Sequence, residues 1–168
     1  VLFRFLSDRL GFNQTGEYFV SENDAIATVL LDSKKCGVMV DVGAHVGSAC
    51  NPFYTKGWHV LAHEPDINSR EILARRVCNF ERVRLDRRAL ADKPQIETDF
   101  FASSESDGIH GLNDFHSSHF ISQKVEVTTL TRSLKEHNIE SIDYLKVDTE
   151  GNDLRVLQGL DWDSHFPE

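Results

Sequence analysis

The chain has few cysteines and no long apolar run, and each absence narrows what the protein can be. Its three cysteines, Cys36, Cys50 and Cys78, are an odd number without the short paired spacings of disulfide frameworks and zinc sites. No apolar run approaches the roughly 18 residues that span a bilayer. The apolar segment Val1–Leu6 is too short for a signal peptide. These features predict a soluble cytoplasmic protein with reduced thiols and no membrane partner.

Basic residues are also in the minority. The 168 residues hold 18 lysines and arginines against 27 aspartates and glutamates, a formal net charge of −9. Such a charge repels a phosphate backbone unless the basic side chains gather on one face. The one basic concentration, six arginines between Arg75 and Arg88, is interleaved with Glu81 and Asp86 and is typical of a solvated surface. We therefore expect no nucleic-acid partner.

Predicted strands and helices alternate along the chain, as in α/β proteins with a parallel sheet covered by helices on both faces. The length favours a single domain, residues 1–168, with a helical lead-in over 1–36 and a cofactor-binding core over 37–160. Residues 102–118 lack periodicity and predict a surface loop. The strands are predicted at 37–42, 58–64, 82–90, 96–101, 124–130 and 142–148, and the helices at 22–31, 47–56, 67–78, 133–138 and 152–158.

A glycine-containing turn follows the first predicted strand. Gly43 and Gly47 allow the backbone to turn sharply and approach a ligand, and the predicted helix N-terminus offers free N–H groups. Glu64, about 20 residues later at the end of the next strand, is placed to accept hydrogen bonds from ribose hydroxyls. The pattern predicts an adenosine-type cofactor, with a purely structural turn as the competing interpretation.

The spacing of the turn bears on which adenosine cofactor binds. A dinucleotide requires G-x-G-x-x-G, but the second glycine position is occupied by His45. S-adenosylmethionine has no phosphate and asks only that the loop pass close to its methionyl part, where Asp41 can meet the ligand's ammonium group. This favours S-adenosylmethionine over a nicotinamide cofactor.

Two carboxylates and an ammonium group lie near the end of the last predicted strand. If the chain stays extended, Lys146, Asp148 and Glu150 point the same way. Ligands of open α/β sheets bind outside the carboxyl ends of the strands, so these groups are expected near the cofactor. The competing interpretation is a structural ion pair with Glu150 capping the next helix.

Four ordered sequence blocks between about Val38 and Leu160 resemble the signatures of FkbM-type methyltransferases. The blocks read D-V-G-A-H-V-G, H-E-P-D-I-N, R-A-L-A-D-K and D-Y-L-K-V-D-T-E-G-N-D-L-R-V-L-Q-G-L. The resemblance implies a Rossmann-like class I methyltransferase sheet, S-adenosylmethionine as donor, and O-methylation of a sugar or small natural product. It implies a donor site formed by Asp41, Gly43, Ala44, His45, Val46, Gly47, Glu64, Pro65, Ala89 and Leu90, with Ala89 and Leu90 beside the adenine.

The resemblance also places Asp148 and Glu150 near the transferred methyl group. Asp148 is the first candidate for the base that takes or orients the acceptor's proton, and Glu150 is the second. The acceptor is expected to be a small molecule or glycan. The family's sheet continues beyond the helix predicted at 152–158, whereas this chain stops at Glu168, so we expect a sheet truncated at its C-terminal strands.

Other classes of function remain open. A nicotinamide-dependent oxidoreductase shares the sheet and Glu64, and a non-catalytic cofactor-binding module keeps the site without methyl transfer. The carboxylates also permit a Mg²⁺ ion, and His110, His116 and His119 lie in one polar loop, but no regular ligand spacing supports a metal site, so none is expected.

Overall fold

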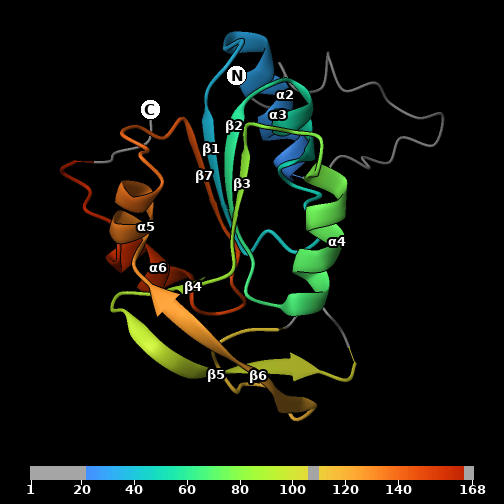
Figure 1. Cartoon of the computed structure of the whole chain (residues 1–168), viewed down its shortest axis with the longest axis vertical. Helices are drawn as coiled ribbons and strands as arrows, with labels where there is room; N and C mark the ends of the chain where they lie inside the picture. Colours follow the sequence, from blue (N-terminus) through green and yellow to red (C-terminus); the bar gives the residue numbers. More distant parts are fainter. Residues whose placement is uncertain (1–21, 106–109, 165–168) are drawn as a thin grey trace.

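A four-stranded parallel sheet forms the centre of the computed structural model, which describes residues 22–105 and 110–164 (Figure 1). Strand β1 (Val38–Val42) lies between β2 (His59–His63) and β7 (Tyr144–Val147), and β3 (Val83–Asp86) lies outside β2. All three pairings are parallel. The predicted α/β architecture with a mostly parallel sheet is therefore confirmed.

Helices cover both faces of this sheet (Figure 1). One face carries α2 (Glu22–Ser33), α3 (Asn51–Thr55) and α4 (Ile67–Val77), and the other carries α5 (Leu130–Glu136) and α6 (Asp153–Gln158). Successive residues of β1 face opposite sides, so Met39 packs in a core with Phe53 and Trp58, whereas Val40 packs in a core with Leu134. Because both faces of β1 are buried, all of its residues except Asp41 are apolar.

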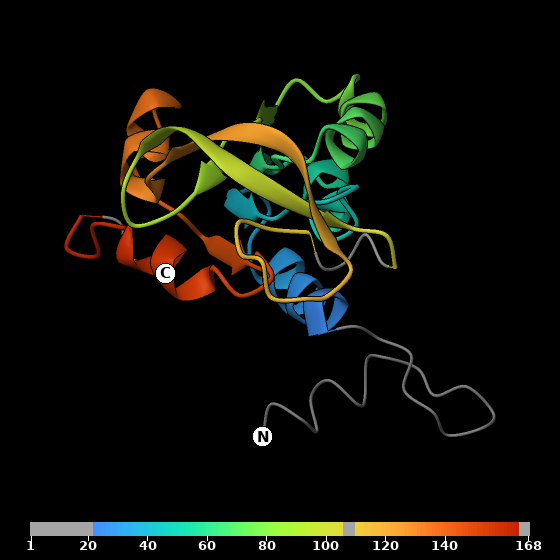
Figure 2. The same ribbon diagram turned by 90° about the horizontal axis from the view of Figure 1, so that it is seen from below.

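A second, three-stranded sheet lies across the carboxyl ends of the parallel strands (Figures 1 and 2). Its middle strand β6 (His119–Thr128) pairs in parallel with β4 (Ala89–Leu90) and antiparallel with β5 (Gln95–Ser103). Phe100, Val125 and Val127 form a small third core beneath it. This sheet closes one side of the site described below.

The strand predicted over 82–90 is wrong in one respect, because the chain bends within it. Strand β3 ends at Asp86, and β4 begins at Ala89 in the other sheet. The Asp86 carboxylate accepts hydrogen bonds from the backbone N–H of Arg88 at 2.9 Å and from its guanidinium at 2.5–3.1 Å. This local pairing stabilises the corner that transfers the chain from one sheet to the other.

Several other element boundaries differ from the prediction: the strand predicted from 124 begins at His119, the helix predicted from 133 begins at Leu130, and β5 runs to Ser103. Two further differences have a visible cause. The helix predicted over 47–56 begins only at Asn51, because Gly47 has a positive φ of 85° and Pro52 lies in the first turn of the helix, a position that proline favours. The strand predicted to reach residue 130 ends at Thr128. The Thr129 side chain instead accepts a hydrogen bond from the Arg132 N–H and caps α5.

Residues 1–21 of the predicted lead-in lie outside the described residues, and the helix predicted at 22–31 is observed as α2. Of the residues that the structure describes, no helix is both long and apolar enough to cross a bilayer. Strand β7 forms one edge of the parallel sheet as described. Truncation of the sheet stays a prediction.

Candidate active site

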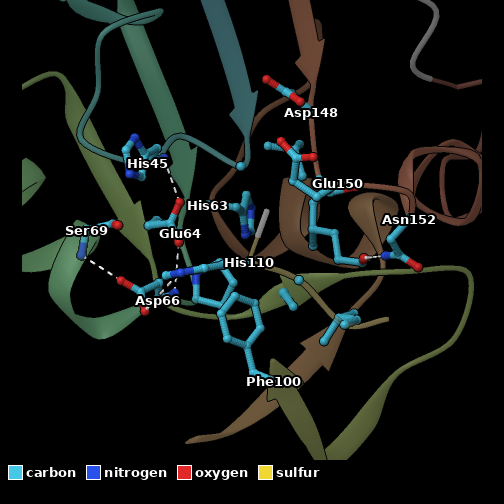
Figure 3. A pocket seen from close by; sticks show the side chains of 18 of the residues that line it. His45, His63, Glu64, Asp66, Ser69, Phe100, His110, Asp148, Glu150 and Asn152 are labelled. Carbon is cyan, nitrogen blue, oxygen red and sulfur yellow. Dashed lines mark hydrogen bonds and ion pairs between the residues drawn. The ribbon is translucent and has the colours of Figure 1, made fainter. Parts of the chain in front are cut away.

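A pocket opens at the carboxyl ends of the parallel strands, beneath the second sheet (Figure 3). It is lined by the ends of β1, β2 and β4, by Phe100 of β5, and by two segments distant in sequence, 110–112 and 148–152. The predicted site residues that line it are Gly43, His45, Glu64, Pro65, Ala89, Leu90, Asp148 and Glu150. The structure thus gathers most of the predicted donor and catalytic residues around one cavity.

The turn after β1 has the sharp geometry that the glycines predict. Gly43 and Gly47 have φ values of 76° and 85°, and His45 also has a positive φ, 50°. A Cβ atom on Gly43 would lie 1.9 Å from the Asp148 carbonyl oxygen, and one on Gly47 would lie 2.4 Å from Leu73 Cδ1. The positions that side chains would take at these two glycines are therefore filled by the protein itself, so their smallness permits close packing of the turn.

Four predicted donor residues, Asp41, Ala44, Val46 and Gly47, are absent from the pocket lining as described. Asp41 is fully buried, and its Oδ1 lies 3.2 Å from the Lys146 ammonium nitrogen. Burial raises the pKa of the Asp41 carboxyl, and the Lys146 charge partly offsets that rise. In this structure Asp41 meets the ammonium group of the protein's own lysine, where the sequence predicts the ammonium group of a ligand.

Glu64 is held rigidly at the end of β2. Its Oε2 accepts a hydrogen bond from the His45 N–H at 2.6 Å, and its Oε1 accepts one from the Asp66 N–H at 2.8 Å. Burial raises the pKa of the Glu64 carboxyl, although these two backbone amides oppose the rise. Each oxygen has a further lone pair, so the carboxylate can still accept hydrogen bonds from a ligand.

The turn that follows Glu64 is anchored on three sides. Asp66 caps α4 by accepting a hydrogen bond from the Ser69 N–H at 2.8 Å. The Pro65 carbonyl accepts hydrogen bonds from Arg70 Nη1 at 2.7 Å and from Gln123 Nε2 of β6 at 2.6 Å. These bonds fix the wall of the pocket formed by the carboxyl end of β2 and tie it to the second sheet.

Lys146 links the glycine turn to Asp148, which follows β7. Its ammonium group donates a hydrogen bond to the Gly43 carbonyl at 2.8 Å and lies 3.6 Å from Asp148 Oδ2. Lys146 and Asp41 are also register partners on β7 and β1. The prediction that Lys146 and Asp148 lie together is confirmed.

Glu150 reaches the pocket by a different route from the one predicted. Strand β7 ends at Val147, and Glu150 has a positive φ of 53°. Glu150 therefore lies at the pocket because the chain turns after β7, and not because the strand continues. Burial is the largest cause that raises the pKa of Glu150, followed by the negative charges of Asp148 and Asp153. Asp148, in contrast, has a side chain that is 60% exposed.

Sequence reasoning missed several lining residues, among them His63, Asp66, Arg88, Phe100 and His110. His63 and Asp66 flank Glu64, so position at a strand end was a usable signal for both. The sequence singled out His110 only as one of three loop histidines weighed for a metal site, because a loop without periodicity gives no signal for a place in this pocket.

The three loop histidines are not gathered into one site. His110 lines the pocket, His116 hydrogen-bonds Ser118 Oγ at 2.7 Å, and His119 stacks on Phe101. Across 22–105 and 110–164, no group of three or more histidine, cysteine, aspartate or glutamate side chains has an arrangement that would hold a metal ion.

The chain matches the model of a known protein family. The model of the family described as the methyltransferase FkbM domain matches residues 41–166, which include every lining residue of the pocket. None of the curated proteins matches the chain.

Proposed function

Because the chain belongs to the FkbM methyltransferase family, it is a methyltransferase, and we propose that it transfers the methyl group of S-adenosylmethionine to a hydroxyl of a small molecule or glycan. One observation carries this proposal. The buried carboxylate of Glu64 and the acidic pair Asp148 and Glu150 line a single pocket at the carboxyl ends of parallel strands. In open α/β sheets this edge binds the ligand.

The residues of the pocket fit an adenosyl sulfonium cofactor. Glu64 offers lone pairs to ribose hydroxyls, and Pro65, Ala89 and Leu90 offer apolar walls to an adenine ring. Bound there, S-adenosylmethionine supplies an electrophilic methyl group on a positively charged sulfur. The carboxylates that line the pocket favour that positive charge.

The same lining disfavours a nicotinamide dinucleotide. The guanidinium of Arg88 is engaged by Asp86 at 2.5 Å and Glu136 at 2.7 Å, so it is not free to pair with a pyrophosphate. The helix after the glycine turn begins only at Asn51, so its N-terminus does not follow the turn as dinucleotide binding requires. These features support the methyl donor over the oxidoreductase alternative.

Glu150 is the better supported general base. A base works best when its pKa lies near the working pH, and burial together with neighbouring carboxylates raises the pKa of Glu150. In this proposal the Glu150 carboxylate accepts the proton of the acceptor hydroxyl. Asp148, which is more exposed and lies close to Lys146, is assigned the role of orienting the acceptor. This order reverses the sequence-based preference for Asp148.

Binding of the donor is the first test. The full chain is titrated calorimetrically with S-adenosylmethionine, S-adenosylhomocysteine and NAD, together with the variants Glu64→Gln and, as a matched control, Glu97→Gln on the exposed part of β5. Loss of charge-assisted hydrogen bonds in Glu64→Gln is expected to weaken both sulfur ligands about tenfold or more, with no effect of Glu97→Gln. Binding of NAD alone would contradict the proposal.

Transfer of the methyl group is tested separately. The labelled donor is incubated with a panel of neutral sugars and hydroxylated small molecules, and Glu150→Gln is expected to lower kcat with little change in donor affinity. A chain that binds the donor but methylates no member of a broad panel would favour the non-catalytic module instead.

A further inference from the structure

The segment 110–113 is fastened on two sides, and this fixes where His110 lies. Gly111 forms two backbone hydrogen bonds with Phe101 of β5, at 2.8 and 3.0 Å. Asn113 Nδ2 donates to the Gly151 carbonyl at 3.2 Å, and a Cβ atom on Gly111 would lie 3.4 Å from the Thr149 carbonyl oxygen. The segment therefore bridges the second sheet and the acidic turn, and it directs the His110 side chain into the pocket (Figure 3).

The His110 side chain is 16% exposed, but its two ring nitrogens are buried and unsatisfied. Both ring nitrogens are inaccessible and have no hydrogen-bond partner within the described part of the chain. The nearest carboxylate oxygen, Asp66 Oδ2, is 3.9 Å from Nδ1, which is beyond hydrogen-bonding distance. Because a buried imidazole always carries at least one N–H donor, its lack of a partner is costly, and such groups in native proteins usually have a functional explanation.

The position of His110 indicates which ligand would satisfy it. Figure 3 shows His110 beside Asp66 and Glu64, whereas Asp148 and Glu150 lie on the opposite side of the pocket. The Glu64 side is the one assigned above to ribose and adenine. Adenine nitrogens and ribose hydroxyls match an imidazole that has one donor and one acceptor.

We propose that His110 is a donor-binding residue: its imidazole hydrogen-bonds the adenosyl part of the methyl donor and does not contact the methyl acceptor. The inference rests on the proposed function, since it takes the donor to be S-adenosylmethionine. It adds a contact to the methyl donor from the segment predicted as a surface loop at 102–118.

This role has a signature that a structural histidine lacks. His110→Leu removes a buried polar group that has no partner in the free protein, so the Tm of the free protein should stay the same or rise. Affinity for the donor should fall in the same variant. A histidine that only supports the fold would show a lower Tm and unchanged affinity.

The experiment measures calorimetric Kd values for S-adenosylhomocysteine, together with the Tm of each free protein. His110→Leu is expected to weaken binding about five- to tenfold, the effect of one lost hydrogen bond, and His110→Gln, which keeps a donor and an acceptor, to retain most of the affinity. The control His116→Leu loses the bond to Ser118 outside the pocket, so it should lower the Tm and leave the Kd unchanged.

A second ligand identifies the part of the donor that His110 contacts. 5′-Methylthioadenosine keeps the adenosyl group but lacks the amino acid, so His110→Leu should weaken it by the same factor. A loss seen with S-adenosylhomocysteine but not with 5′-methylthioadenosine would overturn the inference.

The remaining outcomes separate this inference from the proposed function. Equal affinities of wild type and His110→Leu for S-adenosylhomocysteine would overturn the role of His110 and leave the proposed function intact. Absence of binding by the wild type would overturn both. If the Leu variant does not fold, His110→Ala provides the same comparison, with the same criteria.

Discussion

Gly43 is required for a reason that a second glycine of this chain does not share. Gly43 and Gly57 both have positive φ values, 76° and 83°. A Cβ atom on Gly43 would collide with the Asp148 carbonyl, whereas one on Gly57 would have no heavy atom within 4 Å. Gly57→Ala therefore costs only the strain of a positive φ, whereas Gly43→Ala also causes a clash between the segments that follow β1 and β7.

We expect Gly57→Ala to lower the free energy of unfolding by about 1 kcal/mol and Gly43→Ala to lower it by about 3 kcal/mol or more. Urea denaturation of both variants measures the difference. Similar losses in the two variants would mean that the turn relaxes away from Asp148, and the packing argument for Gly43 would fail.

Single residues of the site differ in how well the sequence predicts them. Glu64, Pro65, Ala89 and Leu90 lie at or just after strand ends, and parallel strands bring their carboxyl ends to one edge. Their place in the pocket therefore follows from the order of the elements. The sequence does not reveal that the Asp41 side chain turns away from this pocket to Lys146, because that depends on the face of β1 on which register places it.

At the scale of elements, His63 joins β2 to α5. Its Nε2 hydrogen-bonds Ser133 Oγ at 2.9 Å, and its Nδ1 lies 3.2 Å from the Arg88 carbonyl. Burial lowers the pKa of His63 to about 4. In the unfolded chain His63 has the ordinary histidine pKa of about 6.5. Between that pH and about 4, the unfolded state therefore binds a proton at His63 that the folded state does not bind.

Folding stability contributed by His63 is therefore fully present above about pH 6.5 and is lost as the pH falls toward 4, by about 3 kcal/mol at most. The variant His63→Gln keeps a neutral side chain of similar size and should lack this dependence. The measurement is the difference in unfolding free energy between wild type and variant at several pH values. A constant difference between pH 7 and 4 would contradict the prediction.

A buried ion pair joins β1 to β7. Asp41 is fully buried and lies 3.2 Å from Lys146, and removing one partner leaves the other charge without compensation. Lys146→Met is expected to cost about 3–5 kcal/mol of unfolding free energy, and the double variant Asp41→Leu with Lys146→Met should recover most of that loss.

Urea denaturation of the two single variants and the double variant gives the coupling energy of the pair. Additive losses would show that Asp41 and Lys146 do not depend on each other. Since Lys146 also donates to the Gly43 carbonyl, incomplete recovery would measure the part that belongs to the glycine turn.

The elements themselves were predictable to the extent that their signals are local. Apolar periodicity located β1, β2, β7 and α4 within a few residues of their observed bounds. The division of 82–90 into β3 and β4 was not visible, because both pieces have strand-like sequence and only their partners differ. The antiparallel pairing of β5 and β6 depends equally on contacts distant in sequence.

At the scale of the whole molecule, the net charge of −9 acts differently on the proposed donor and on its demethylated product. S-adenosylmethionine carries a sulfonium charge that S-adenosylhomocysteine lacks, so only the donor gains from the negative potential of the protein and its acidic pocket. Salt screens that attraction.

We expect the Kd of S-adenosylmethionine to rise about two- to fivefold between roughly 0.05 M and 0.5 M salt, and the Kd of S-adenosylhomocysteine to change much less. Calorimetric titrations at several salt concentrations measure both. An equal salt response of the two ligands would show that the acidic residues do not act on the sulfonium charge of the donor.

The corner at Asp86 connects both sheets with a helix. Its carboxylate pairs with Arg88, which directly precedes β4, and lies 3.1 Å from His137 Nε2, which directly follows α5. Arg88 also pairs with Glu136. Replacement of any one member leaves the others with unmatched charge or hydrogen bonds. We therefore expect relatives of this protein either to keep these residues together or to exchange them together, and sequences that change Asp86 alone to be rare.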